Sequence, residues 1–587
     1  MTFHRWTNVV AVISLLRTYA AAAYTLPQDS SDPLDRAAAI LTTQLGFTYG
    51  AAVAGGPYYP SGALGTVKAA ADQAAIQLEV LPETALSATD TAAATAGALV
   101  DKYDGLKTVN DYTLLYNGEW TSTLPKGPVP GILTNYTQDL LFSMERLSNS
   151  PYAVRRLNPS VDTLAFDVDE SVAQLISGST LQGLLDAGRL FYVDHSAQGD
   201  LARVAGRYAP ACDAYFYISE TSGEFLPLAI RTGVGANLIY TPQDEAADWL
   251  LAKMMFSIND SWFVDWFHLA STHEVVQIVW MAAIRTLSVE HPVYALLNRL
   301  TYQVFAIQPI AASILFNTGG TVDQIFGYTG AAAQDYTTNL YFNGGAGNFE
   351  ANYFLTNLQN RGLINSTFGP ELTHFPFYED ASTIYTAIKG FMTTFVESYY
   401  SSASVLQADT EIQAWAKEAN GAANISGFPE SILTTETLVD ILTQMAHLVS
   451  TAHHTSNTND LLSLTGTLPL HPAAFYQPLP TTKGNTSVVD FLPPLDKCVE
   501  QLAFSALFAR PLLVNTSRSL LHMFDDPVLL AGLNADTAAA AVTFQTSMQR
   551  FSEEVGARGF DDQGLSQGMP FVWQTLDPNV APYSITT

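Results

Sequence analysis

Apolar and polar positions follow two different patterns along the chain. Between Leu190 and Tyr240, short apolar runs are separated by turn residues, which predicts short strands. From Glu245 onward, apolar residues mostly recur at helical spacing, which predicts that helices dominate the rest of the chain. We expect helices at residues 63–81, 140–147, 292–306, 381–401, 410–419, 434–451 and 535–555. The fold class is therefore expected to be mainly α, with a few short strands.

The segments between these elements bear on the domain organisation. Residues 24–60 are rich in Pro, Gly and Asp and are expected to lie over the surface. Residues 85–100 are rich in Ala and Thr and predict no definite element, and a Pro-rich connection occupies residues 468–494. No internal repeat or shift in composition marks a boundary after residue 23. We therefore expect one large helical domain at residues 24–587.

The stretch from Trp262 to Leu300 combines a long apolar run with two histidines. Residues 262–286 are apolar on nearly every side, which predicts a central buried helix, and Asp244 is expected to cap the helix before it. Burying His268 and His273 without partners would cost about 1–3 kcal/mol each. On a regular α-helix, residues five apart point about 140° away from each other. A π-turn would align them, and such turns concentrate at functional sites, so we predict one here.

A second histidine cluster lies between residues 447 and 460. Within it, His453 and Asn457 are four apart and share one face of a predicted helix. Three imidazoles and an amide oxygen would suit a first-row metal such as iron or manganese. Buried histidines hydrogen-bonded to other side chains are the alternative. For His291, before a Pro at a predicted helix start, structural and functional roles are both open. The isolated histidines are expected to be satisfied core or surface residues: His195, His374, His447, His471 and His522.

Composition and charge narrow the possible functions. The chain has 587 residues, of which 48% are hydrophobic and 14% charged, as in a well-packed globular protein. Its formal net charge of -29 argues against binding to nucleic acid or to an anionic membrane surface. The longer apolar runs are broken by polar residues, so no transmembrane segment is expected.

The N-terminus and the glycosylation acceptors predict export. His4 and Arg5 precede a short apolar run, and Ala20 to Ala23 offer a small-residue cleavage site, so residues 1–23 are predicted to be a signal peptide. N-glycans are expected on a secreted, extracellular protein, with acceptor sequences at Asn135, Asn259, Asn365, Asn424, Asn485 and Asn515. Asn259 directly precedes the apolar run and is expected to be buried and unmodified. Cys212 and Cys498 could form one disulfide or remain two buried thiols.

Taken together, the histidine motifs resemble the lipoxygenase family, most closely the secreted fungal manganese lipoxygenases. The motifs are His268-x4-His273, His291-Pro292 and His453-x3-Asn457. Supporting matches are WLLAK at 249–253, YEDASTIY at 378–385, QAW at 413–415, GFP at 427–429 and the ending APYSITT. The resemblance implies a large helical catalytic domain, here without the N-terminal β-barrel domain of plant and animal relatives.

The resemblance also implies a mononuclear non-haem metal site. The expected ion is one manganese, with iron as the alternative. Its implied ligands are His268, His273, His453, the side chain of Asn457 and the main-chain carboxylate of Thr587. Family members usually end in Ile or Val, so Thr587 departs from the pattern, although the ligating carboxylate atoms belong to the main chain.

The implied reaction is dioxygenation of 1,4-pentadiene polyunsaturated fatty acids, such as linoleic and α-linolenic acid, to hydroperoxides. A metal(III)-hydroxide removes a bis-allylic hydrogen, and dioxygen adds to the resulting radical. By resemblance, Ala311 controls oxygen access and favours an S product, and Leu315 clamps the substrate. Ordinary helix packing is the alternative for both. Arg510 and Arg518 are candidate cations for the substrate carboxylate, and a monomer is expected.

Two other functions are compatible with the same residues. The chain could be a catalytically silent secreted lipid-binding or interaction protein on this scaffold. Thr587 supports this reading, as does Thr458-Asn459-Asp460 in place of the family's usual Phe-Gly-Gln. It could also be a hydroperoxide isomerase that uses the same site.

Overall fold

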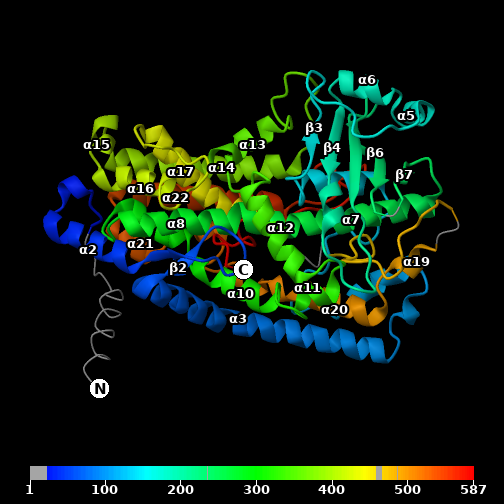
Figure 1. The fold of residues 1–587 in the computed structure, drawn as a ribbon, viewed down its shortest axis with the longest axis horizontal. Helices are drawn as coiled ribbons and strands as arrows, with labels where there is room; N and C mark the ends of the chain where they lie inside the picture. The colour runs from blue at the N-terminus through cyan, green and yellow to red at the C-terminus, as the bar shows by residue number, and fades with distance from the viewer. Residues whose placement is uncertain (1–22, 235, 458–465, 485–486, 587) are drawn as a thin grey trace.

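One helical rod, interrupted by a single π-turn, runs through the middle of the molecule (Figure 1). A computed structural model describes residues 23–234, 236–457, 466–484 and 487–586. The rod consists of helix α7 (Ala246–His268), the π-turn η6 (Leu269–His273) and helix α8 (Glu274–Thr286). Most of its side chains are buried, because the sequence is largely apolar and other elements cover the rod.

The rod confirms the predicted central helix and corrects its start. The helix predicted at residues 262–286 is buried but begins at Ala246, well before the histidines. The predicted cap is wrong, because Glu245 occupies the N-cap position and no side chain caps the helix. The carboxylate of Asp244 instead accepts the backbone N–H of Thr241 at 2.7 Å, which closes the turn that precedes the helix.

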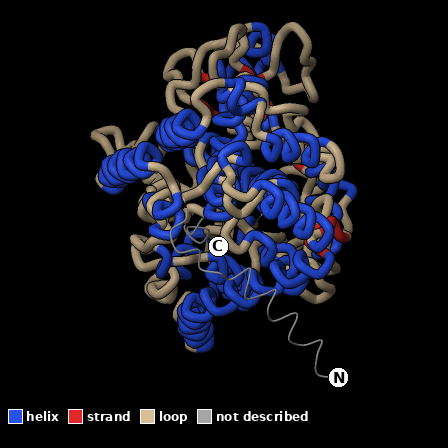
Figure 2. Tube along the Cα trace, turned by 90° about the vertical axis from the view of Figure 1, so that its left-hand side faces the viewer, coloured by secondary structure: helices blue, strands red, loops and turns tan. Residues whose placement is uncertain are grey.

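Shorter helices enclose the rod, and Figure 2 shows how little strand the molecule contains. They are α9 (Pro292–Leu300), α10 (Ile307–Ile314), α11 (Thr321–Ile325), α12 (Gly330–Phe342), α13 (Phe354–Asn360), α14 (Pro376–Tyr399), α15 (Ala403–Gln407), α16 (Thr410–Asn420), α17 (Thr435–His447), α18 (His453–Ser456), α19 (Val488–Phe491), α20 (Leu495–Phe508), α21 (Pro527–Gly532) and α22 (Ala535–Gly556). Helix α14 packs against α17 and α22, while α16 packs against α8. The predicted helix at 292–306 breaks after Leu300, because Gln303 adopts a left-handed conformation at φ 56°.

The N-terminal region is more ordered than its composition suggested. Residues 24–60 contain helix α2 (Pro33–Gly46), which starts where Asp32 accepts the N–H of Asp35, and strand β1 (Thr48–Gly50) pairs with β2 (Tyr59–Ser61). Helix α3 (Gly62–Leu99) joins the predicted helix at 63–81 to the Ala/Thr-rich residues beyond it. Pro82 lies inside α3, which packs against α20 along one side. These contacts stabilise a helix whose later residues carry no apolar stripe by which periodicity could predict it.

A five-stranded antiparallel sheet lies at one end of the molecule (Figure 1), as the alternating apolar runs predicted. Its order is β3 (Arg155–Arg156), β4 (Leu190–Asp194), β5 (Cys212–Ile218), β6 (Phe225–Thr232) and β7 (Ile239–Tyr240). Helices α4 (Asp139–Met144) and α7 pack on it, as do α5 (Glu170–Ser177) and α6 (Leu181–Asp186). Strand β5 is therefore buried along its whole length, which explains its unbroken apolar sequence.

A buried ionic network joins the segment after α4 to helix α7. The guanidinium of Arg146 lies 2.7 Å from a carboxylate oxygen of Glu145 and 3.2 Å from one of Asp260. The ring nitrogen Nε2 of His195 lies 3.0 Å from Asp260, and that of His471 lies 2.9 Å from Glu145. All five side chains are buried, so each charge depends on the others for its stability.

Two further sequence expectations can be compared with the structure. Cys212 and Cys498 are both buried free thiols, which decides between the two alternatives left open. Among the described residues, no helix is both long enough and apolar enough to cross a membrane.

Candidate metal centre

The π-turn η6 brings His268 and His273 to one face of the rod. A π-turn is wider than a turn of α-helix, so residues five apart come into line. The hydroxyl of Thr272 donates to the carbonyl of His268 at 2.6 Å and so gives that carbonyl a partner within the distorted turn. The two imidazole rings lie 5.5 Å apart, centre to centre. The predicted π-distortion is confirmed.

A second π-turn, which the sequence did not lead us to predict, precedes His453. This turn, η9 (Leu448–Ala452), separates α17 from α18 and contacts η6. The hydroxyl of Ser450 donates to the carbonyl of Ala446 at 2.6 Å, as Thr272 does in the first turn. A Ser-Thr pair close to the His-His pair was the available sequence evidence for it. The contact between the two π-turns explains how residues far apart in sequence meet.

Three imidazoles converge where the π-turns meet. One ring nitrogen from each of His268, His273 and His453 lies within 4.8 Å of the others. The Nε2 atoms of His273 and His453 are 2.8 Å apart. All three side chains are buried. The structure therefore brings together the three histidines that the sequence singled out.

The three imidazoles are neutral near pH 7. Burial lowers the pKa of His268 to about 4. Burial, followed by the repulsion of neighbouring imidazoles, lowers the pKa of His273 and that of His453 well below the usual value. A neutral imidazole has one bare ring nitrogen, which is the form that binds metals. Three such rings around one point match the donor set that a first-row metal ion requires.

The orientation of His268 is set by its own helix. Its Nδ1 lies 3.2 Å from the carbonyl oxygen of Val264, one turn earlier. Because a carbonyl only accepts, Nδ1 carries the proton and Nε2 is left bare. Hydrogen bonds of this kind commonly hold metal-ligating histidines in place.

Asn457 lies beside the three imidazoles, where the sequence placed it. It ends helix α18, and its backbone N–H donates to the carbonyl of His453 at 2.8 Å. Its amide Nδ2 is 3.4 Å from Nε2 of His453. Rotating the amide exchanges nitrogen and oxygen without changing its shape, so Oδ1 can take the same position. The structure thus supplies a fourth donor next to the histidine cluster.

The C-terminal tail reaches the same region. Residues 581–586 are buried, and the carbonyl oxygen of Ser584 lies 3.1 Å from Nε2 of His454, the neighbour of His453. Thr587, the predicted fifth ligand, lies outside the described residues. So do Thr458, Asn459 and Asp460, on which the alternative of a silent protein partly rested.

The two predicted channel residues lie in helix α10 and at its C-cap. Ala311 and Leu315 are both buried. The next residue, Phe316, packs its ring 5.4 Å from that of Trp266, two positions before His268. On the same helix, Gln308 donates to Glu274, directly after His273, at 2.8 Å. Helix α10 is therefore fixed against the rod on both sides of the π-turn.

Three other histidines make structural contacts away from the cluster. His291 caps α9, because its Nδ1 accepts the N–H of Val293 at 3.1 Å, and its Nε2 is 3.0 Å from a carboxylate oxygen of Asp409. These bonds occupy both ring nitrogens, so of the two roles left open for His291 the structure supports the structural one. His195 and His471 belong to the ionic network around Arg146.

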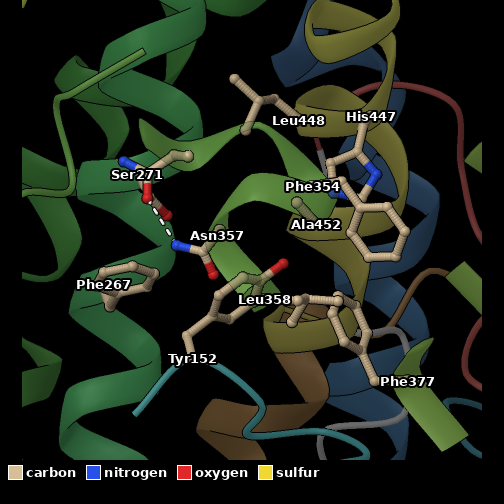
Figure 3. A pocket seen from close by; sticks show the side chains of 11 residues that line it. Tyr152, Phe267, Ser271, Phe354, Asn357, Leu358, Phe377, His447, Leu448 and Ala452 are labelled. Atoms are coloured by element: carbon tan, nitrogen blue, oxygen red, sulfur yellow. Dashed lines mark hydrogen bonds between the residues drawn. The ribbon is translucent and has the colours of Figure 1, made fainter. Parts of the chain in front are cut away.

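A small pocket lies beside both π-turns, and Figure 3 shows Tyr152 and His447 entering it from opposite sides. Its lining includes Phe267, Ser271 and Ala452. The Oη of Tyr152 and the Nδ1 of His447 are buried and have no hydrogen-bond partner among the described residues. The space open to a water-sized sphere is about 20 Å³, which corresponds to roughly one water molecule and is far too small for an acyl chain.

His447 gives a test of how burial affects stability in acid. Burial lowers its pKa from 6.5 to about 3. The unfolded chain therefore binds this proton first, and the contribution to stability, complete above pH 6.5, is lost as the pH falls toward 3. In His447→Phe, the free energy of unfolding should depend less steeply on pH, by about 1.4 kcal/mol per pH unit between pH 6 and 4. Urea titrations of metal-free protein at several pH values measure this, and equal slopes for both proteins would contradict it.

The comparisons with known proteins agree with this geometry. A family model described as Lipoxygenase matches residues 162–515. The chain is 46% identical over 566 residues to a protein named manganese lipoxygenase from Fusarium oxysporum, covering 96% of this chain and 92% of that protein. It is 44% identical to one from Colletotrichum gloeosporioides, with the same coverage. A solved structure titled Manganese Lipoxygenase aligns at a TM-score of 0.94 and 41% identity, covering 96% of this chain and all of that one.

These matches extend well beyond the histidine motifs and confirm the expected helical catalytic fold. The chain belongs to the lipoxygenase family.

Proposed function

We propose that the protein is a manganese lipoxygenase that adds dioxygen to polyunsaturated fatty acids with a 1,4-pentadiene, such as linoleic and α-linolenic acid, to give hydroperoxides. One observation carries the proposal: the buried ring nitrogens of His268, His273 and His453 converge within 4.8 Å in a chain of this family. Its relatives at 44–46% identity are named for manganese, which favours manganese over iron as the ion.

We assign the metal ligands to five groups. His268, His273 and His453 supply imidazole nitrogens, Asn457 supplies its side-chain oxygen and Thr587 supplies its main-chain carboxylate. When bound, the ion would supply the one-electron oxidation that converting a bis-allylic carbon to a radical requires. The protein's own part is to keep the imidazoles neutral by burial and to hold their bare nitrogens toward one point.

The residues that we assign to substrate and oxygen lie in and directly after α10. Ala311 lies in α10 and Leu315 caps it, next to Phe316, which packs on Trp266 of the rod. We therefore assign Ala311 to oxygen access and Leu315 to clamping of the pentadiene. Replacing Ala311 by Gly removes one methyl group next to the substrate and should raise the R share of the hydroperoxide. Chiral chromatography of the products measures this. Leu315→Ala serves as the comparison, because it should weaken substrate binding without the same change in chirality.

The candidate cations for the substrate carboxylate differ in their contacts. Both terminal nitrogens of Arg518 already donate, Nη1 to Glu79 and Nη2 to the C-terminal tail. Among the described residues, Arg510 donates to the main-chain carbonyls of Leu507 and Ala509, and the carboxylate of Glu83 is its nearby charged neighbour. Burial lowers the pKa of Arg510 to about 10, so it still carries its charge at pH 7. We therefore favour Arg510 as the cation at the carboxylate end.

The function is tested by metal analysis and by activity on linoleate. We expect about one manganese ion per chain and a rise in conjugated-diene absorbance that requires dioxygen. Well-folded protein that contains manganese but gives no diene would support the silent scaffold instead. Product formation from a fatty-acid hydroperoxide without oxygen uptake would support the isomerase. Stoichiometric iron with full activity would overturn the choice of metal alone.

We further propose that the protein is secreted and glycosylated after removal of residues 1–23, of which 1–22 lie outside the described residues. Asn259 is buried, and its amide donates to Gln198 and to Pro210, so it should carry no glycan. The exposed acceptors, all at left-handed φ near 50–60°, are Asn365, Asn424 and Asn515. Peptide mass mapping of secreted protein should find glycans at these three, and a glycan on Asn259 would contradict the buried position. Asn485 lies outside the described residues.

A further inference from the structure

Arg518 binds the buried C-terminal tail at three points. Its main-chain carbonyl accepts the N–H of Tyr583 at 3.0 Å. Its Nη2 donates to the hydroxyl of Ser584 at 3.2 Å and to that of Thr586 at 3.1 Å. These two hydroxyls are themselves 3.0 Å apart. One arginine thus fixes both the backbone and the side chains of the tail.

Arg518 is held in turn by the N-terminal helix α3. Its Nη1 donates to a carboxylate oxygen of Glu79, and its guanidinium lies 4.3 Å from the ring centre of Tyr302. The other oxygen of Glu79 accepts from the hydroxyl of Tyr302 and, at 3.0 Å, from the amide of Gln303. Both guanidinium ends therefore have defined partners, which limits the positions that Arg518 can adopt.

The tail determines which nitrogen of His454 carries a proton. The carbonyl oxygen of Ser584 lies 3.1 Å from Nε2 of His454 and can only accept, so Nε2 is protonated. In a neutral imidazole the other nitrogen, Nδ1, is then an acceptor. It lies 3.2 Å from Nδ1 of His453, which must donate. The proton of His453 is thereby placed on Nδ1, and its Nε2 is left bare toward His268 and His273.

We propose that the C-terminal tail, held by Arg518, fixes the tautomer of His453 through His454, so that the bare Nε2 of His453 faces the metal. Arg518 and His454 are thus positioning residues that touch neither substrate nor the reacting atoms. The inference rests on the proposed metal site and adds to it a role for two residues outside the ligand set. It also gives the tail residues before Thr587 a role in orienting a metal ligand.

Release of manganese to a chelator tests the role of His454. Outer hydrogen-bond partners of metal-binding histidines change metal affinity by about 10–100-fold. We therefore expect His454→Leu to release manganese about 10-fold faster or more, since Leu can neither accept from His453 nor donate to Ser584. His454→Gln should stay within about threefold of wild type, because its amide can do both. If the Leu and Gln variants release manganese at equal rates, His454 does not fix the tautomer of His453.

The spectrum of the bound ion gives a second readout of the same variants. The electron paramagnetic resonance spectrum of bound manganese(II) should change in His454→Leu and remain close to wild type in His454→Gln. A loss of folding alone would affect circular dichroism and would not be restored by Gln. If His454→Leu does not fold, the Gln variant still decides the question. Release by His454→Gln about 10-fold faster than wild type would contradict the proposal.

The role of Arg518 is tested on metal-free protein. Losing charge-assisted hydrogen bonds to Ser584 and Thr586 should raise hydrogen exchange of the peptide 580–587 about tenfold in Arg518→Ala. Arg518→Lys should restore part of the protection, because Lys has no fork to reach both hydroxyls and Glu79. The control is Arg550→Ala, since Arg550 is exposed on α22. Unchanged hydrogen exchange in Arg518→Ala would show that Arg518 does not hold the C-terminal tail.

Metal-free protein also separates this inference from the proposed function. Nitrogen-15 spectra of histidine-labelled protein distinguish protonated from bare ring nitrogens. The proton of His453 should be on Nδ1 in wild type and should redistribute between the two nitrogens in His454→Leu. If wild-type protein binds no manganese, the proposed function fails whatever these spectra show. If it binds manganese but His453 is protonated on Nε2, the proposed role of His454 and Arg518 is wrong and the proposed function stands.

Discussion

Replacing His273 by Ala should abolish both manganese binding and fatty-acid oxygenation. The side chain supplies one of three converging nitrogens, and its Nε2 lies 2.8 Å from that of His453. Without it, two imidazoles, the amide oxygen of Asn457 and the proposed carboxylate of Thr587 form a much weaker site, because the number of ligands affects metal affinity. We expect the manganese content to fall from about one ion per chain to less than about 0.1. Diene formation from linoleate should fall in parallel.

The matched control for this variant is His447→Phe. His447 is also a buried histidine, but it faces the pocket beside the π-turns instead of the metal centre. This variant should keep its manganese and most of its activity. If His273→Ala keeps manganese and oxygenates linoleate at the wild-type rate, the ligand assignment is wrong. If both variants lose manganese equally, the effect belongs to histidine burial in general and not to the assigned ligands.

Replacing Arg146 by Met should lower the free energy of unfolding by about 3–5 kcal/mol. The guanidinium lies between the carboxylates of Glu145 and Asp260, and its side chain is only 1% exposed. Removing it takes away the guanidinium that lies beside both buried carboxylates, which keep the imidazoles of His471 and His195 as neighbours. Methionine keeps much of the packing against Phe142 and Phe256, so the measured loss reports the charge. Urea unfolding monitored by circular dichroism measures the change.

The control for Arg146 is again an arginine at the surface. Arg550→Met removes a guanidinium that is 78% exposed, and its effect should be within about 0.5 kcal/mol of zero. Arg146→Lys should fall between the two, since Lys restores the charge without a fork that reaches both carboxylates. An Arg146→Met protein as stable as wild type would show that the network is not required for stability.

Hydrophobic periodicity predicted the long helices well and the N-terminal region badly. The run around His268 was readable because it is apolar on every side and has no turn residues. Helix α3 was not, because its residues beyond Leu81 are mostly Ala and Thr and it contains Pro82. Its stability comes from packing on α20 and from long-range contacts such as the hydrogen bond from the N–H of Leu512 to Glu83, 429 positions apart in the sequence. No local pattern encodes such a contact.

For the metal centre, spacing within one element was informative and spacing between elements was not. The five-residue step from His268 to His273 indicated a π-turn because a regular helix would separate the two rings. The step from His447 to His453 gave no such indication, since only His453 is in the cluster. His454, Arg518 and Glu79 were invisible as a connected set, because they come from three distant segments. Only the folded structure shows that hydrogen bonds connect them through the C-terminal tail.

The buried position of Asn259 has a consequence for how the protein is made. Its acceptor sequence is exposed only while the chain is unfolded, whereas its amide is enclosed by Gln198 and Pro210 once the sheet packs on α7. In a compartment that glycosylates nascent chains, attachment of a sugar and formation of the core therefore compete for the same asparagine. A glycan on Asn259 would prevent its amide from packing against Gln198 and Pro210. If the protein is exported as proposed, the yield of folded protein should depend on which of these two processes is faster, and replacing Ser261 by Ala would remove the acceptor sequence at Asn259.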